Sequence, residues 1–330
     1  MLTKKQNLLE TLKRDGHPDR FVNQYNPFVF ITSDPIMQFT RGNRVRGTTS
    51  KDQWGTTILF PEDQFAAMPH VTEENKVCPD ITEWRKYVKV PDLEANCTDW
   101  SACLADSAKV DRDEQMTMVI MGTGIFEQCH FLMGFEDTLM NLLLEPEDME
   151  DLIQAIADYR YTYTKMLIEN LKPDAILSHD DWGSKASLFF SPEVWRTMFK
   201  PHYKKLYRLM KENGVLVVHH ADSYLEPIIE DMVEIGVDVW QGVLPQNDIV
   251  KMGKILDGRM GLMGGIDAAV VDRADAAEEK IRSEVRNACT KYRNVKGFMP
   301  CMTYGGPGSM FPHVDAIITD EINKCSAEMF

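Results

Sequence analysis

Three residue types that bind zinc stand at the ends of apolar runs in this sequence. His220 and Asp222 follow the run 215–219 closely, and Cys301 follows the run 297–300. Imidazole, carboxylate and thiolate are all zinc ligands, and three protein ligands leave one position open for a substrate. The spacing predicts a catalytic zinc site. His220 and Asp222 could instead cap the following helix, and Cys301 could be a small buried apolar residue.

Acidic and histidine side chains follow two other apolar runs. His179, Asp180 and Asp181 come directly after the run 174–178, and Glu127 comes shortly after 116–121. Two adjacent carboxylates repel each other, which raises the pKa of one of them and favours a general acid–base role. We therefore predict His179, Asp180 and Asp181 to be catalytic. Glu127, or alternatively His179, is the candidate for a fourth metal ligand or a proton donor, and we take Glu127 as the ligand. Such a pair of Asp residues more often contains one exposed and one hydrogen-bonded side chain.

Aromatic and amide side chains occupy comparable positions and could contact a substrate. The predicted substrate-binding residues are Phe126, Trp182, Trp240 and Gln241. Tyr304, three residues after Cys301, is a further catalytic candidate, and its ring could stack on an aromatic substrate together with the others. Four of the eight histidines, at 130, 179, 219 and 220, lie in these segments, which favours a functional site over coincidence.

Short β-prone runs alternate with long amphipathic stretches from residue 116 onward. The β-prone runs are 116–121, 174–178, 215–219, 237–240, 260–263 and 297–300. This alternation is typical of a parallel sheet, whose functional residues collect at the carboxyl ends of the strands. With Phe28–Ile31 as a seventh strand and 54–60 as an eighth or a small hairpin, the count favours an α/β fold, a (β/α)8 TIM-type barrel. A doubly wound open sheet is the alternative, but no GxGxxG turn follows an early strand.

The first third of the chain has a different texture. Residues 1–112 are irregular, with a first helix over 3–15, and we expect them to elaborate a single barrel domain spanning 1–330. The segment Gly305–Ser309 is rich in glycine and is predicted to be a turn at the rim of the site.

Composition excludes several classes of partner and location. The 330 residues carry a formal charge of −15, which disfavours nucleic acid and anionic membrane surfaces. No run of about 18 apolar residues indicates a membrane helix, and the N-terminus does not resemble a signal peptide. Seven cysteines without a CxxC pair favour a reduced, cytoplasmic protein.

Several motifs resemble the uroporphyrinogen decarboxylase superfamily. They are Ser191-Pro-Glu-Val-Trp195, the run from Asn213 to His220, and Gly236-Val-Asp-Val-Trp240. The resemblance covers about residues 115–305 and implies a (β/α)8 barrel. The arginine-containing N-terminal motif with which the decarboxylases hold a tetrapyrrole does not occur, so the chain is more similar to the corrinoid-dependent methyltransferases of the superfamily.

That branch carries a His-x-Cys pair and a distant Cys that bind zinc, and the corresponding residues here are His220, Asp222 and Cys301. The carboxylate of Asp222 donates less charge than a thiolate, so we expect a more electrophilic zinc, suited to polarising an ether or phenolic oxygen. The resemblance then implies removal of a methyl group from a small methoxylated aromatic compound. The acceptor would be the Co(I) centre of a corrinoid on a separate protein.

Two other functions remain open at this point. One is a metal-free decarboxylase or lyase of the same fold, for which Asp180, Asp181 or Tyr304 would be essential. The other is a barrel that binds a small molecule or a partner without catalysis, which the crowding of His and Asp disfavours. A homodimer is one option for the oligomeric state.

Overall fold

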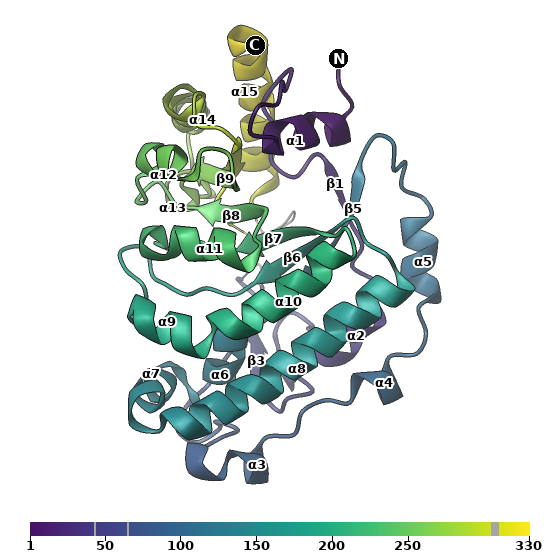
Figure 1. Cartoon of the computed structure of the whole chain (residues 1–330), viewed down its shortest axis with the longest axis vertical. Helices are drawn as coiled ribbons and strands as arrows, with labels where there is room; N and C mark the ends of the chain where they lie inside the picture. The colour runs from purple at the N-terminus through teal and green to yellow at the C-terminus, as the bar shows by residue number, and fades with distance from the viewer. Residues whose placement is uncertain (43, 65, 305–309) are drawn as a thin grey trace.

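The computed structural model describes residues 1–42, 44–64, 66–304 and 310–330, and its centre is one curled parallel sheet (Figure 1). The predicted turn Gly305–Ser309 lies outside this part of the chain. Seven strands pair in the order β1-β5-β6-β7-β8-β9-β10, and every pair is parallel. Their bounds are Phe28–Phe30, Met116–Met121, Ala175–His179, Leu216–His220, Val239–Val243, Gly261–Ile266 and Phe298–Met302. The predicted TIM-type α/β fold is confirmed.

The chain before β1 reaches across to β10, at the other edge of the sheet. The backbone N–H of Gln24 donates to Pro300 O over 3.2 Å, and Gln24 Oε1 accepts from the Met302 N–H over 3.4 Å. Gln24 adopts a left-handed conformation, with φ of 49°. This irregular segment therefore lies where a regular barrel would have a strand.

Helices cover the outer face of the sheet, and α8 and α10 cross the front of the view in Figure 1. After β5 come α6 (Ile125–Met133), α7 (Phe135–Leu144), α8 (Pro146–Asn170), α9 (Pro192–Met198), α10 (Lys200–Glu212), α11 (Ile229–Ile235), α12 (Ile249–Leu256), α13 (Ala268–Val271), α14 (Glu278–Tyr292) and α15 (Pro312–Met329). The helices α9 and α10 are separated at Phe199, because Pro201 has no amide proton to continue the hydrogen-bond ladder. None of the described helices is long and apolar enough to cross a bilayer.

Between β1 and β5 the chain builds further elements outside the parallel sheet, of which α3 lies at the bottom of Figure 1, below α8. These elements are α2 (Pro35–Thr40), an antiparallel sheet of β2 (Thr48–Lys51), β3 (Thr57–Phe60) and β4 (Met68–Pro69), and the short helices η1 (Ile81–Glu83), α3 (Trp84–Tyr87), α4 (Leu93–Asn96) and α5 (Ser101–Ser107). The segment predicted as an eighth strand or a hairpin is thus part of this small sheet. Trp54 packs edge-on against Tyr159 of α8, with the ring centroids 4.9 Å apart.

Two apolar layers enclose the parallel sheet. The larger lies between the strands and their helices. The smaller fills the interior of the curled sheet and includes Met118, Leu177, Met263, Met299 and Cys301. Leu8 of α1 (Lys4–Leu12) belongs to this inner layer, so the first helix packs against the barrel interior. The polar site lies where the strands end.

Candidate active site

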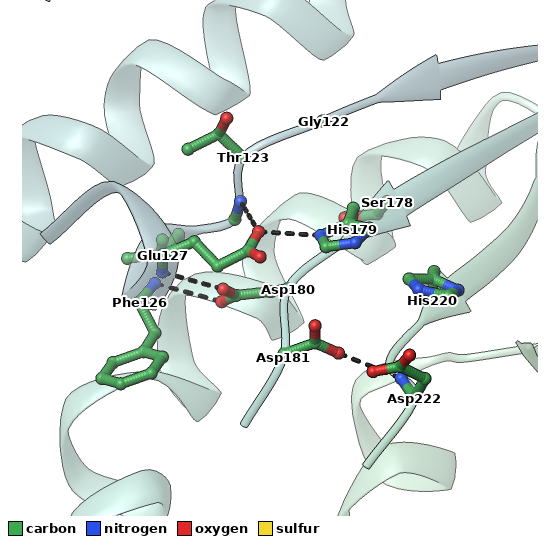
Figure 2. Close-up of polar contacts among 12 residues, drawn as sticks. Gly122, Thr123, Phe126, Glu127, Ser178, His179, Asp180, Asp181, His220 and Asp222 are labelled. Atoms are coloured by element: carbon green, nitrogen blue, oxygen red, sulfur yellow. Dashed lines mark hydrogen bonds and ion pairs between the residues drawn. The ribbon is translucent and has the colours of Figure 1, made fainter. Parts of the chain in front are cut away.

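The candidate site forms at the carboxyl ends of β5, β6 and β7 (Figure 2). His179 is the last residue of β6, Asp181 follows it by two, and His220 ends β7. Glu127 stands in the first turn of α6, directly after β5. Because parallel strands end at the same rim, side chains distant in sequence meet there.

Glu127, His179 and Asp181 form a group of metal-ligand type. Their donor atoms all lie within 4.8 Å of one another, and this is the one such group found among the described residues. Glu127 was predicted as a metal ligand, whereas His179 and Asp181 were predicted as catalytic. One imidazole and two carboxylates are a donor set that suits a borderline-soft divalent cation such as Zn²⁺.

Glu127 and His179 are an ion pair. Glu127 Oε2 lies 2.8 Å from His179 Nδ1 and also accepts the Gly124 N–H over 2.9 Å. Burial alone would lower the pKa of His179, but the charge of Glu127 outweighs it and raises this pKa to about 10. Burial would raise the pKa of Glu127, and the charge of His179 outweighs that effect and lowers it. The pair is therefore ionised at neutral pH.

Asp181 and Asp222 add negative charge to the same place. The Asp222 backbone N–H donates to Asp181 Oδ1 over 3.0 Å (Figure 2). Burial, together with repulsion from Glu127 and Asp222, raises the pKa of Asp181 to about 8, although His179 opposes this. Burial is also the main cause that raises the pKa of Asp222 to about 6. Glu127 and His179 neutralise each other and Asp181 is largely protonated at neutral pH, so the carboxylate of Asp222 leaves one excess negative charge. A bound cation would neutralise this charge and favour the ionised form of Asp181.

Asp180 has a different environment from its neighbour. It is fully buried, and its carboxylate accepts hydrogen bonds from Glu127 N (3.0 Å), Phe126 N (3.1 Å), Trp182 Nε1 (2.9 Å) and the Tyr203 hydroxyl. The carboxylate thereby satisfies two free N–H groups in the first turn of α6 and holds that turn, with Glu127, against β6. Asp180 is a positioning residue in this structure.

The predicted zinc set of His220, Asp222 and Cys301 does not assemble in this structure. The amide of Gln241 stands between two of its members: Oε1 contacts His220 Nδ1, and Nε2 lies 4.0 Å from Cys301 Sγ. Nε2 also donates to Met302 O (3.2 Å) and Tyr304 O (3.1 Å), which fixes the amide in place. Burial in the inner apolar layer raises the pKa of Cys301, so its thiol remains protonated, which disfavours metal binding.

The four residues predicted to bind substrate are fully buried, and their side chains contact other residues of the protein. Phe126 packs against Phe135, Phe189, Phe190 and Phe199. Trp182 and Trp240 donate their indole N–H groups to Asp180 and to Ala221 O (2.9 Å). Gln241 is the amide described above. Tyr304, predicted as catalytic, is 36% exposed and does not contact the Glu127–His179–Asp181 group through any described hydrogen bond.

The histidines that suggested a site divide into two groups. His220 stacks on His179 at a centroid distance of 4.5 Å and therefore faces the site. His219 points to the other side of β7, where it stacks on Trp182 at 4.0 Å and contacts the Tyr207 hydroxyl at 2.8 Å. Burial lowers the pKa of His219 well below its usual value. Adjacent strand residues face opposite ways, so one of the two histidines had to leave the site.

A cavity of about 360 Å³ opens beside Glu127 and His179. Its apolar lining includes Met37, Trp54, Ile120, Phe131, Tyr159 and Tyr163. None of these was predicted as a site residue, because they come from α2, the β2–β3 loop, β5, α6 and α8, which meet only in the folded chain. The one signal in the sequence was Trp54, an aromatic residue in a polar connection.

Arg160 stabilises the loop between β5 and α6, which borders this cavity. It is 1% exposed, and its guanidinium donates to Gly122 O (3.1 Å), Thr123 O and Ser178 Oγ (2.9 Å). Thr123 has a positive φ of 49°, a conformation that L-residues rarely adopt without support. The buried arginine therefore holds the strained turn that leads into Glu127.

The fold is similar to that of a methyltransferase from Methanosarcina mazei, with 15% identity, 99% of each chain covered and a TM-score of 0.68. A sugar phosphate isomerase/epimerase from Parabacteroides distasonis matches at 11% identity over 68% of this chain and 75% of that one, with a TM-score of 0.32. A search of curated proteins finds no match. The family model for uroporphyrinogen decarboxylase (URO-D) matches residues 50–307, and the chain belongs to this family.

Proposed function

We propose that this protein is a methyltransferase of a corrinoid-dependent system, which removes the methyl group of a small methoxylated aromatic compound. The observation that carries the proposal is the metal-ligand group Glu127–His179–Asp181 at the edge of an aromatic-lined cavity. The URO-D family and the fold shared with a methyltransferase support it. The methyl acceptor is the Co(I) centre of a corrinoid carried by a partner protein.

Zn²⁺ is the cation proposed for this group, held by Glu127, His179 and Asp181. The donor types and the excess negative charge described above fit such an ion. Bound zinc would supply Lewis acidity toward the ether oxygen of the substrate. Breaking the bond between His179 and Glu127 frees both side chains for this role.

The residues of this chain orient the substrate and supply a proton. Trp54, Tyr159 and Phe131 present aromatic surface on which a ring can pack, and their apolar walls exclude water. The corrinoid of the partner protein would supply the Co(I) nucleophile that accepts the methyl group, and the ether oxygen would keep the electron pair of the broken bond. That oxygen then takes a proton. Asp222 is half-buried beside Asp181, and its raised pKa of about 6 suits it to hold and deliver that proton.

A reducing cytoplasm is the proposed location. Co(I) chemistry requires such conditions, and the seven cysteines of the chain are all buried free thiols. The corrinoid protein would approach the carboxyl ends of the strands, where the metal-ligand group lies.

Metal content tests the proposal directly. We expect about one zinc per chain after zinc is supplied, loss of that zinc in Glu127→Gln and Asp181→Asn, and retention in Cys301→Ser, whose thiol lies behind Gln241. The reverse pattern, with zinc lost only in Cys301→Ser, would show that the ligands are the set predicted from the sequence and that Gln241 moves aside.

Activity completes the test. Methoxylated aromatic compounds are supplied with a reduced corrinoid protein, and methylcobalt formation is followed by absorbance. Transfer that needs zinc supports the proposal. Release of carbon dioxide from a substrate in the presence of a chelator would instead identify a metal-free decarboxylase of the same family.

A further inference from the structure

The wall of the cavity that comes from the N-terminal part of the chain is positively charged. Arg41 and Arg44, from the end of α2 and the segment after it, both line the cavity with Asp52 of the β2–β3 loop. The protein as a whole carries a charge of −15. Two arginines facing one small cavity in so acidic a chain suggest a local function.

Arg44 lacks a carboxylate partner in the described part of the chain. Its guanidinium makes only two long hydrogen bonds there, to Arg41 O (3.4 Å) and Ala67 O (3.5 Å), although it carries five N–H donors. The side chain is half-buried. Burial and then repulsion from Arg41 lower the pKa of Arg44 to about 10, so it remains charged at neutral pH in unfavourable surroundings. Such a cation gains most from an added anion.

The other charges in this wall do not neutralise it. Arg41 is exposed, and its guanidinium contacts Met37 Sδ at 3.6 Å. The Asp52 carboxylate attracts Arg44 but forms no ion pair with it within 4.0 Å. Asp52 Oδ1 is occupied by the N–H groups of Trp54 and Thr56, both at 2.9 Å. Two cations thus face one carboxylate that already serves the backbone.

A second, independent observation comes from Gln128. This side chain lines the same cavity and is 4% exposed, yet its Nε2 finds no hydrogen-bond acceptor among the described residues. Buried amide donors almost always have a partner, because losing water without replacing its hydrogen bond is unfavourable. An oxygen atom of a ligand in the cavity would supply the missing acceptor.

We propose that the substrate carries a carboxylate, which pairs with the guanidinium of Arg44 while Gln128 Nε2 donates to a ligand oxygen. The inference rests on the proposed function and extends it, since it names the substrate class: methoxylated aromatic acids. Arg44 is then a specificity-determining residue. The aromatic ring packs against the wall formed by Trp54 and Tyr159, and the ether oxygen lies toward Glu127 and His179, which line the same cavity.

Matched ligands isolate the carboxylate. The ring isomers of methoxybenzoate and the corresponding methoxybenzamides have nearly the same shape and differ in charge. Isothermal titration calorimetry of the full-length protein, with and without zinc, measures their affinities. Because a charged hydrogen bond contributes about 1.5–3 kcal/mol, at least one acid should bind roughly tenfold or more tightly than its amide.

Matched variants isolate the arginine. Arg44→Gln should abolish the preference for the acid, and Arg44→Lys should keep part of it because charge remains without the planar fork. Arg46→Gln is the control: Arg46 is exposed, stacks on Phe60 at 5.5 Å and does not line the cavity, so the preference should persist. Circular dichroism confirms that each variant folds. If Arg44→Gln does not fold, the test rests on Arg44→Lys, whose preference for the acid should be weaker than that of the wild type.

The outcomes separate this inference from the proposed function. If no acid binds more tightly than its amide, or if the preference survives in a folded Arg44→Gln protein, the inference is wrong. Binding needs neither metal nor corrinoid. Selective binding without methyl transfer would therefore count against the proposed function alone, and transfer from neutral compounds at equal rates would count against this inference alone.

Discussion

Replacing Asp180 by Asn should destabilise the protein, whereas replacing its neighbour Asp181 by Asn should not. Asp180→Asn retains the size of the side chain but replaces an acceptor oxygen by a donor. At least one of its four buried donors, such as Glu127 N at 3.0 Å, then loses its partner, and the others bind a neutral acceptor. One unpaired buried group costs about 1–3 kcal/mol, and each weakened charged bond costs several tenths more. Relief of burying a charge offsets part of this loss. We expect a net loss of about 2–4 kcal/mol.

Asp181→Asn is the matched control at the next position. Asp181 accepts from Asp222 N (3.0 Å) and the Ser223 hydroxyl (3.3 Å), and an amide oxygen can still accept both. Burial and repulsion from Glu127 and Asp222 disfavour a charge at this position, and the amide carries none. Without metal, we expect this variant to be as stable as the wild type or more stable.

Urea unfolding in a chelator tests the pair. For a slope of about 3 kcal/mol per molar urea, the Asp180→Asn midpoint should fall by roughly 1 M, while that of Asp181→Asn stays constant or rises. The reasoning would be refuted if Asp181→Asn lost more stability than Asp180→Asn, because the hydrogen bonds of Asp180 would then not hold the site together.

Three further predictions concern the same framework. In Gly124→Ala, the new methyl group would lie 1.9 Å from Asp180 Cγ, so we expect a loss of about 3 kcal/mol or more in urea unfolding, whereas Gly122→Ala, with open space within 4 Å, should change stability by less than about 1 kcal/mol. Burial is the main cause that raises the pKa of Asp52 to about 6, above its value of about 3.9 in the unfolded chain. The free energy of unfolding of the wild type should therefore fall by up to about 3 kcal/mol as the pH rises from about 4 to about 6. Asp52→Asn keeps the acceptor oxygen and should not show this fall in stability. If the difference in stability between the wild type and Asp52→Asn does not vary with pH, the pKa of Asp52 is not raised. Zinc at about 100 times its Kd should stabilise the protein by about 2.7 kcal/mol, and a chelator should reverse the shift in urea midpoint.

The parallel sheet was predictable because its signals are local. The strand β5 has the predicted bounds, and the others lie within three residues of theirs, since buried parallel strands read as short apolar runs bounded by polar residues. The final helix α15 was not predicted. Polar residues that follow the strands also indicated the carboxyl ends of the sheet, where the structure brings Glu127, His179 and Asp181 together. All three residues were therefore among the candidates.

The roles within the site could not be assigned from position alone. Asp180 and Asp181 are neighbours, yet Asp180 holds the first turn of α6 and Asp181 belongs to the metal-ligand group, a difference set by the direction of each side chain. Of the aromatic residues predicted to bind substrate, Phe126 and Trp182 follow strands and Trp240 lies within β8, and all three are buried in the core. The cavity depends on packing between segments more than fifty residues apart, such as Trp54 against Tyr159, which no local pattern reveals.

The cavity joins two parts of the chain that can vary independently. The metal-ligand group and its supports come from the ends of β5, β6 and β7, where Asp180, Arg160 and Gly124 constrain one another tightly. The facing wall comes from α2 and the small antiparallel sheet, before residue 70. Substitutions in that wall change what the cavity accepts without disturbing the strand ends. The ligand that the cavity accepts can then change through substitutions in this N-terminal segment, while the residues at the strand ends stay the same.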